Sequence, residues 1–446
     1  MRQLKLALVL SAMLACRGAV AQTFSAISFT GKTGAVLGSQ PTASLVLSGT
    51  TLYGMTDAGG GSSNFGNVFS VGTNLTGFQN ILTFTGSTGA ALGAHPQGNV
   101  TLSGTTLFGM TSQGGTGSTF SYGNIFKIGV SGSGYENLLS FTNSTTSGRF
   151  PTGSLSLVGG SLYGLTPSGG SVGIGNGNFF NIGVDGSGYQ NLLSFPSVAN
   201  GGNTPFNSLT LSGSTFYATA SSGGTSGHGA VFSIGADGSG YQTLVSFTGT
   251  TGVAPGDSPS GSLLLSGSTL YGMTRAFGAG GALNGTLFSV GTDGSSFQNL
   301  LSFTGTTGAA PGLDPSGGLI LSGTTLYGMT QFGGSHHAGN IFGIGINGTG
   351  YHDLFDFTGG TDGSNPRGDL TLSGGTLFGL AIAGGASGNG TIFALAGVAA
   401  TPEPGTLAIV GCGAAALLSY HWQRMRREGH GRLCQQIEAN KIEKRA

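Results

Sequence analysis

Carboxylates are the side chains of this sequence that could do acid–base chemistry, and their densest group is Asp353, Asp356 and Asp362. A glycosidase needs two carboxylates that face each other across a sugar. Asp353 and Asp356 are separated by an odd number of positions, so on one regular strand they point to opposite faces. This spacing argues against an acid–base pair. Asp185, Asp237 and Asp293 each precede a glycine, and we interpret them as turn residues, because calcium needs several oxygen ligands from one loop.

Histidine is the other residue type that could hold a metal ion. His336 and His337 are adjacent in a glycine-rich stretch, and His228 occupies a comparable stretch two repeats earlier. Adjacent histidines rarely converge on one metal ion without a third ligand. We therefore interpret them as exposed loop residues, and the sequence predicts no metal site, no cofactor site and no catalytic residue.

The amino-acid composition limits which structural elements could position such side chains. The chain has 446 residues, of which 91 are glycine, 7% are charged and 38% are apolar, and its formal net charge is zero. The apolar content argues against disorder, and the missing triplet repeat excludes collagen. Fifteen basic residues over this length exclude a nucleic-acid groove. Residues 22–404 contain no cysteine, so this segment has no disulfide or thiolate site.

The middle of the chain is a tandem repeat with a step of about 51 to 56 residues. An aliphatic-aromatic-glycine element, such as Leu52-Tyr53-Gly54, recurs six times, and Phe216-Tyr217-Ala218 is its divergent seventh copy. An apolar-Phe element, such as Val68-Phe69, tracks it. Each repeat also has an alternating stretch at its start and an aromatic-x-x-apolar-apolar-x-Phe element at its end. These four strand-length runs between glycine-rich turns predict a four-stranded antiparallel sheet per repeat.

Repeats of this size with four strands predict an all-β, seven-bladed β-propeller over residues 22–398. An open β-solenoid is the alternative. The last repeat lacks its fourth strand, whereas Thr23 to Phe29 is an isolated copy of that strand. We therefore expect the N-terminal strand to complete the last blade and close the ring, which removes an exposed sheet edge. The glycine-rich loops, such as Gly59-Gly60-Gly61-Ser62, fall at one position in each repeat and should lie on one face.

The N-terminus is predicted to be a secretory signal peptide over residues 1–21. Arg2 and Lys5 precede an apolar run, and Ala19 and Ala21 form a small-x-small cleavage site before Gln22. A lipoprotein signal ending at Cys16 is the alternative. Export is the expectation.

The C-terminus is predicted to hold one transmembrane helix over residues 405–423. Eighteen apolar-rich residues rising about 1.5 Å each span about 27 Å, which just crosses a bilayer core. A linker, residues 399–404, precedes this helix, and the mixed-charge tail 424–446 follows it. The basic cluster places the tail in the cytoplasm. This cluster consists of Arg424, Arg426 and Arg427.

Pro402-Glu403-Pro404, an apolar helix and an arginine cluster together resemble the PEP-CTERM sorting signal of Gram-negative bacteria. That resemblance implies an exosortase-type membrane enzyme as partner, cleavage near the motif, and release to or retention at the cell surface. Glu428 to Ala446 extend beyond the usual end of such signals, and a plain inner-membrane anchor is the alternative. The repeat region resembles the GloVer-type tandem repeat of bacterial surface proteins, which implies an exported protein and supplies no catalytic residues.

Residues 22–398 carry five basic and eleven acidic side chains, a net charge of −6. We therefore predict a non-enzymatic structural or adhesive module of the extracellular matrix or biofilm, with an extracellular polysaccharide as its possible partner and no nucleic acid. The alternative is a secreted carbohydrate-active enzyme, a glycosidase or lyase, that uses the channel of the ring. An enzyme needs convergent carboxylates or a metal at the axis, whereas a structural module leaves the axis apolar or lined by serine and threonine.

Overall fold

The glycine-separated segments fold as β-strands, as the repeat pattern predicts. The computed structural model describes residues 21–116, 122–142, 144, 147–170, 176–195, 202–278 and 284–398. Within these residues the secondary structure is β-strand, turn and loop, and no helix is present. Short strands rich in threonine, leucine and aromatic residues alternate with turns in which glycine adopts a positive φ.

Each blade contains an inner, a second, a third and an outer strand. The inner strands are β2 (Val46–Ser48), β6 (Thr101–Ser103), β11 (Ser156–Val158), β17 (Thr210–Ser212), β22 (Asp257–Ser266), β26 (Ile320–Ser322) and β30 (Ser364–Ser373). The second strands are β3 (Thr51–Thr56), β7 (Thr106–Thr111), β12 (Ser161–Thr166), β18 (Thr215–Ala220), β23 (Thr269–Ala276), β27 (Thr325–Thr330) and β31 (Thr376–Ala383). The third strands are β4 (Asn67–Gly72), β8 (Asn124–Gly129), β14 (Asn178–Gly183), β20 (Ala230–Gly235), β24 (Thr286–Gly291), β28 (Asn340–Gly345) and β32 (Thr391–Ala396). The outer strands are β5 (Gln79–Thr83), β9 (Glu136–Ser140), β15 (Gln190–Ser194), β21 (Gln242–Ser246), β25 (Gln298–Ser302), β29 (His352–Asp356) and β1 (Thr23–Ser28).

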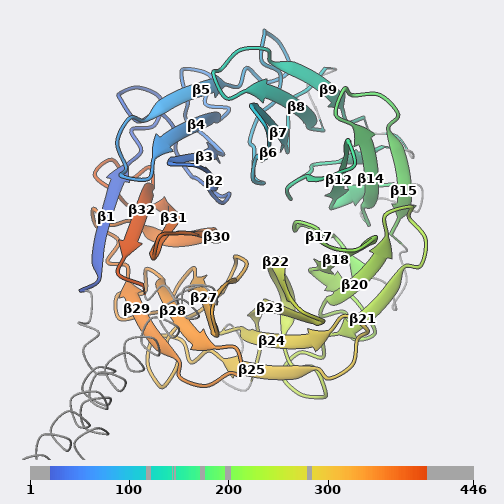
Figure 1. Ribbon diagram of the computed structural model, residues 1–446, viewed down its shortest axis with the longest axis vertical. Helices are drawn as coiled ribbons and strands as arrows, with labels where there is room; N and C mark the ends of the chain where they lie inside the picture. The colour runs from blue at the N-terminus through green and yellow to red at the C-terminus, as the bar shows by residue number, and fades with distance from the viewer. Residues whose placement is uncertain are drawn as a thin grey trace, which may run out of the picture. The chain divides into compact units, whose positions relative to one another are not determined.

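Seven four-stranded antiparallel sheets, numbered here as blades 1 to 7 from β2 to β30, form a closed ring in the described residues (Figure 1). Blade 7 is completed by β1, which pairs with β32 from Thr23↔Ala396 to Ser28↔Thr391. The prediction that the N-terminal strand closes the ring is confirmed, and the open solenoid is excluded. Two short pairs that the sequence does not predict, β10 (Gly148–Arg149) with β13 (Ser168–Gly169) and β16 (Gly202–Asn203) with β19 (Ser222–Gly223), brace the loops of blades 3 and 4.

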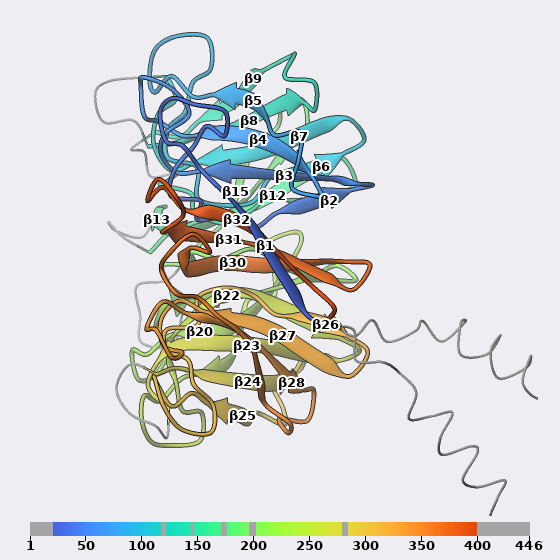
Figure 2. The same cartoon turned by 90° about the vertical axis from the view of Figure 1, so that its left-hand side faces the viewer.

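The ring has two different faces, because the strands of each blade are antiparallel. The loops from second to third strands and from each outer strand to the next blade gather on one face, called here the loop face (at the left in Figure 2). The tight turns between inner and second strands and between third and outer strands occupy the opposite turn face. Val398 lies at the turn face, since its N–H donates to Gly375 O, in the β30–β31 turn, at 3.1 Å.

The repeated glycine after Leu-Tyr has a packing reason. Gly54 of β3 is paired directly with Phe69 of β4, and a Cβ on Gly54 would lie 2.5 Å from Phe69 Cζ and 3.0 Å from Leu45 Cδ2. A phenylalanine of the third strand therefore needs the space that a side chain on the second strand would fill. Blade 4 is the exception, with Ala218 opposite Phe232.

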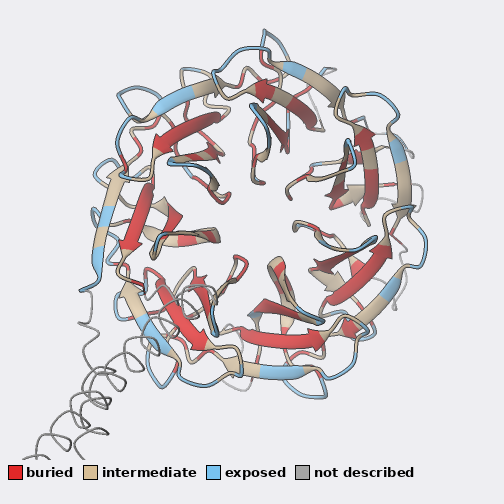
Figure 3. Ribbon diagram, viewed as in Figure 1, coloured by how far each residue is buried: buried red, intermediate tan, exposed pale blue. Residues whose placement is uncertain are grey.

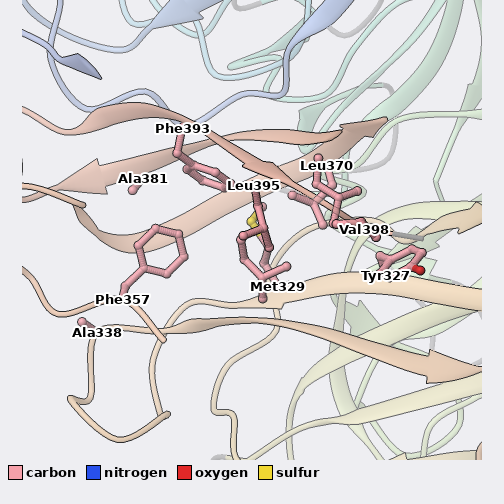
Figure 4. Packing of buried hydrophobic residues seen from close by; sticks show 11 residues of the cluster. Tyr327, Met329, Ala338, Phe357, Leu370, Ala381, Phe393, Leu395 and Val398 are labelled. Atoms are coloured by element: carbon pink, nitrogen blue, oxygen red, sulfur yellow. The ribbon is translucent and has the colours of Figure 1, made fainter. Parts of the chain in front are cut away.

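The hydrophobic core lies between blades and not within them. Second and third strands are buried and outer strands are partly exposed (Figure 3). Seven clusters each join two consecutive blades. In the cluster between blades 6 and 7, Met329 and Phe357 of blade 6 pack against Phe393 and Leu395 of blade 7 (Figure 4). Each blade thus depends on both neighbours for burial of its apolar faces.

The predicted export and sorting elements lie largely outside the described residues. Ala19 and the rest of the signal peptide up to residue 20 are not described, and neither are residues 399–446, which include Pro402, Glu403, Pro404, Arg424, Arg426 and Arg427. In the described part of the chain, no helix has the length and apolar character needed to cross a membrane.

Candidate functional site

A cavity of about 360 Å³ lies on the axis of the ring, at the loop face. Each blade begins with a loop that contains a proline, and the residue after that proline lines the cavity in all seven blades. We call these seven residues the axial ring. The axial ring consists of Thr42, Gln97, Thr152, Phe206, Ser260, Ser316 and Arg367. Its chemistry is mainly hydroxyl and amide, with one aromatic and one cationic side chain.

Two residues further along each loop, hydrogen bonds join the blades around the axis. Ser44 N donates to Asn99 Oδ1 at 2.6 Å, Asn99 N donates to Ser154 Oγ at 2.8 Å, and Ser154 N donates to Ser208 Oγ at 3.2 Å. Each bond runs from the backbone of one blade to the side chain of the next. This girdle satisfies backbone groups that a central hole would leave unpaired.

Asp369 belongs to this girdle, and it is the one carboxylate among the described residues that line the cavity. Its Oδ1 accepts from Gly318 N at 2.5 Å and its Oδ2 from Ser262 Oγ at 2.9 Å. Because Gly318 has no side chain, Asp369 reaches past blade 6 to blade 5. Burial raises the pKa of Asp369, and these two hydrogen bonds oppose the rise. Its role is to link blades, since both oxygens are engaged.

In five of the seven loops, the residue between the axial ring and the girdle is a glycine, and close backbone contact explains it. A Cβ on Gly317 would overlap the carbonyl oxygen of Gly368, and a Cβ on Gly368 would overlap that of Ala43. Consecutive loops therefore touch backbone to backbone at the axis. Because blades 6, 7 and 1 meet here, Ser316, Arg367 and Thr42 come from three adjacent loops.

The residue before each loop proline has a positive φ, between 52° and 57°. Such values are uncommon outside glycine, and here they recur at one position of every blade. The seven residues differ in type. They are Gln40, His95, Phe150, Thr204, Ser258, Asp314 and Asn365. The loop backbone is thus held constant while the side chain at this position varies.

Charged pairs cross from blade to blade near the cavity mouth. Arg275 binds Asp314 through Nε at 2.6 Å and through a second guanidinium nitrogen at 2.7 Å. His95 Nδ1 lies 3.3 Å from Asp57 Oδ2, and this contact raises the pKa of His95 against the effect of burial. His228, which the sequence placed in an exposed loop, lies 3.4 Å from Asp257 and is partly exposed.

The prediction that Asp353 and Asp356 point to opposite faces of their strand is wrong. A β-bulge between Ile341 and Phe342 lets Phe342 pair with Asp353 and Ile341 with Phe355. The extra residue puts Asp353 and Asp356 on the same side of the strand, where the charge of one carboxyl acts on the other. Burial and the charge of Asp356 raise the pKa of Asp353 to about 6.

The histidines near this pair do not complete a catalytic triad. Ser335 Oγ contacts Asp356 Oδ2 at 2.6 Å and His336 Nδ1 at 2.9 Å. A triad places histidine between serine and the acid, whereas here serine lies in the middle. Asp362 instead accepts hydrogen bonds from Thr358 N and Oγ1 at 2.7 and 2.6 Å. Among the described residues, no group of three His, Cys, Asp or Glu side chains could hold a metal ion.

The turn aspartates lie where the sequence places them. Asp185 lies between β14 and β15, and its Oδ1 accepts from Ser187 N at 3.0 Å and Ser187 Oγ at 2.8 Å. These bonds lower the pKa of Asp185. Asp237 and Asp293 make the same contacts in their own hairpins. Their carboxylates stabilise turns on the turn face, far along each blade from the cavity.

Sequence reasoning did not find the axial ring. The signal was available in the Gly-x-x-Pro-x pattern that opens the repeats, for example Gly93 to Gln97. The pattern alone does not indicate that the residue after proline lines the axis, because this follows only from the geometry of the ring. The arrangement can hydrogen-bond a polar ligand, stack a flat face on Phe206, and offer Arg367 to a negative group.

The fold and this cavity define a seven-bladed β-propeller with a polar axial site. The chain belongs to the Gloeobacter/Verrucomicrobia repeat family, whose model matches residues 92–280 and 160–393. No curated protein matches the sequence.

Three solved structures match large parts of this chain at low sequence identity. The GH74 enzyme of Niastella koreensis is 14% identical with a TM-score of 0.53, and the match covers 83% of this chain and 53% of that enzyme. An oligogalacturonate lyase in complex with manganese is 11% identical with a TM-score of 0.49, covering 84% of this chain and 96% of the lyase. A chain of a nidogen/laminin complex is 14% identical with a TM-score of 0.37, covering 58% of this chain and 82% of that one. This chain therefore spans about half the length of the GH74 enzyme, and the likeness concerns the fold alone.

Proposed function

We propose that this protein is an exported, non-enzymatic binding module of the bacterial cell surface or extracellular matrix, and that its axial cavity holds a saccharide. The observation that carries the proposal is the axial ring. Seven loops converge on a cavity whose size falls within the range of small-molecule sites, about 300–1,000 Å³. Hydroxyl and amide side chains surround it, which suits the many hydroxyl groups of a sugar.

Phe206 supports a saccharide ligand. Its side chain is 42% exposed and lines the cavity, which is unusual for a large apolar residue in this well-buried ring. An exposed aromatic face beside hydroxyl groups can pack against the apolar face of a sugar ring while its hydroxyls bond to serine and threonine. Phe150 is similarly exposed, at 37%, but does not line the cavity, so the two residues form a natural comparison.

The alternative, a secreted carbohydrate-active enzyme, draws on Asp353 and Asp356. A carboxyl with a pKa of about 6 suits a proton donor. However, the two carboxyls of a glycosidase face each other across a gap of about 5 Å or more that admits a sugar or water, whereas these two lie on the same side of a single strand. Neither lines the axial cavity. We therefore favour binding over hydrolysis.

Sorting completes the proposal. The signal peptide, cleaved between Ala21 and Gln22, exports the chain, and the PEP-CTERM-like tail delivers it to an exosortase-type enzyme. The described propeller ends at Val398 on the turn face, and the cavity opens on the loop face.

Binding is tested with purified residues 22–398, which contain every strand of the seven blades. We expect at least one neutral or acidic extracellular polysaccharide to bind, with affinity falling about tenfold in Phe206→Ala and staying unchanged in Phe150→Ala. Calorimetry and product analysis are run on the same samples. Failure of all polysaccharides to bind, equal loss in both variants, or release of shortened saccharide would contradict the proposal.

Sorting is tested with the full chain. In a host that has an exosortase, mass spectrometry of the mature protein should show a new N-terminus at Gln22 and loss of the residues after the Pro-Glu-Pro motif. Pro402→Ala with Pro404→Ala should block the second cleavage. A mature protein that keeps residues 405–446 in the inner membrane would mean that the tail is a plain anchor.

A further inference from the structure

Arg367 is an unpaired cation inside the polar axial cavity. It is partly buried. Among the described residues, no carboxylate lies within 4 Å of its guanidinium and no hydrogen bond to it is formed, whereas Arg275 nearby is held by both oxygens of Asp314. Asp369, two residues along the chain, is directed to Gly318 and Ser262 instead. A guanidinium withdrawn from water without an acceptor is costly, and none of the described side chains supplies one for Arg367.

Two further donors flank Arg367. Thr42 Oγ1 and Ser316 Oγ are both buried without a hydrogen-bond partner among the described residues, and both belong to the axial ring. Thr42 enters blade 1 and Ser316 enters blade 6, so they stand on either side of Arg367 in blade 7. Gly317 and Gly368 bring these three loops into backbone contact. One guanidinium between two unpartnered hydroxyl groups is a donor set for an anion with two or more oxygens.

The electrostatic setting agrees with an anion at this position. Burial and the neighbouring charge of Arg275 lower the pKa of the Arg367 guanidinium, so its positive charge is held in an unfavourable place. The negative charges of Asp314 and Asp57 raise the pKa of Arg367, but they offset this lowering only in part. A negative group bound at Arg367 would relieve the desolvation of the cation.

The charge of the whole propeller limits which anion fits. Residues 22–398 have a net charge of −6, and the acidic side chains repel a ligand that carries many negative groups. A ligand with one carboxylate on an otherwise neutral sugar places its single charge on Arg367 and its hydroxyls on the serine and threonine of the axial ring. A planar carboxylate also matches the fork of one guanidinium.

We infer that the axial cavity is a uronic-acid site, in which Arg367, flanked by Thr42 and Ser316, binds the carboxylate of an acidic sugar residue within a mostly neutral saccharide. This inference rests on the proposed function, because it assumes that a saccharide occupies the axial cavity. It adds the group that is recognised and the side chains that recognise it.

Cellobiouronate and cellobiose test the inference, because these disaccharides differ by one carboxylate. We expect residues 22–398 to bind cellobiouronate about ten- to a hundredfold more tightly than cellobiose by calorimetry. Arg367→Gln should abolish this preference, so that the two disaccharides bind with equal affinity. Arg367→Lys should retain a reduced preference, since lysine keeps the charge and loses the fork. Lys32→Gln, which removes the same charge at an exposed loop position, should behave as the wild type.

Thr42→Val provides a second variant that leaves the charge in place, and it should weaken cellobiouronate binding several-fold more than cellobiose binding. Equal affinity of the wild type for the two sugars, or a preference that survives Arg367→Gln in a folded variant, would overturn the inference while leaving saccharide binding intact. Displacement of cellobiouronate by an equal concentration of inorganic phosphate would overturn the assignment to a sugar carboxylate. Failure of both disaccharides, together with all polysaccharides, would refute the proposed function itself.

Discussion

Replacing Asp353 with Asn and Asp356 with Ser would give blade 6 the pair that other blades carry. In blade 2, Asn137 Nδ2 donates to Ser140 Oγ at 2.9 Å, and blade 3 repeats this bond between Asn191 and Ser194. Blade 6 has two carboxyls at these positions, and they repel each other when both are ionised. We expect the double variant to be more stable than the wild type at pH 8 and to lose that advantage in acid.

The magnitude follows from the pKa of Asp353. Its rise from 3.8 to about 6 in the folded protein corresponds to at most about 3 kcal/mol. The carboxyl of Asp353 is only partly withdrawn from water and the residue as a whole is exposed, so solvent screening reduces this to about 1 kcal/mol. Because the pKa of Asp353 is higher in the folded protein than in the unfolded chain, the folded protein binds this proton more tightly. The stability contribution of the pair is therefore present below about pH 4 and is lost as the pH rises through about 6.

Urea unfolding of both proteins at pH 3.5, 5, 6.5 and 8 measures this effect. The difference in unfolding free energy should grow from near zero at pH 3.5 to about 1 kcal/mol at pH 8. Asp237→Asn is a control with the opposite sign, because hydrogen bonds from Ser239 lower the pKa of Asp237 and its contribution is lost in acid. A difference between the double variant and the wild type that is constant with pH would refute the raised pKa of Asp353.

The remaining predictions concern the packing of the ring. Phe29→Ala should lower the free energy of unfolding by about 3–5 kcal/mol in urea titrations, because the ring of Phe29 is fully buried. It lies 5.4 Å from the ring of Phe69, where blade 7 meets blade 1. An effect under about 1 kcal/mol would mean that the closing strand contributes little to stability. Gly317→Ala should lower the free energy of unfolding by about 1–3 kcal/mol in the same assay, since the new Cβ would meet a backbone carbonyl. Gly49 has open space around it but a positive φ, so Gly49→Ala should lower the free energy of unfolding by only about 1 kcal/mol. Asn124→Ala should cost about 1–3 kcal/mol, because it removes a buried side chain that donates to Leu92 O at 3.2 Å, and hydrogen exchange in blade 2 should rise with it.

The repeat pattern predicted most of the fold because each blade is built from local signals. Alternating residues, Asp-Gly turns and a fixed repeat length specify four strands and their hairpins. The orphan copy of the outer strand at Thr23 to Phe29 predicted the closure that β1 and β32 make. The pairing of Gly54 with Phe69 was not predicted, because two elements about fifteen residues apart acquire their relation only from the strand register.

The site was less accessible to sequence reasoning. Asp353 and Asp356 were assigned to opposite faces because a regular strand was assumed, and one bulged residue reverses that assignment. The axial ring was not predicted, because its members share a position in the repeat and not a residue type. Phe206 and Arg367, for example, have in common only the proline that precedes each of them. Their convergence depends on blades that lie far apart in the chain.

By itself, the sequence determined the repeat number, the strands and the closure of the ring, whereas the signal peptide and the sorting tail stay predictions. These features follow from periodicity, turn chemistry and composition, which act between residues near each other in the chain. Only the tertiary structure decided which side chains meet. The ring brings Thr42, Ser316 and Arg367 together at its axis because the close-packed loops of blades 1, 6 and 7 touch through glycine, and no local pattern records a contact between residues about 325 positions apart.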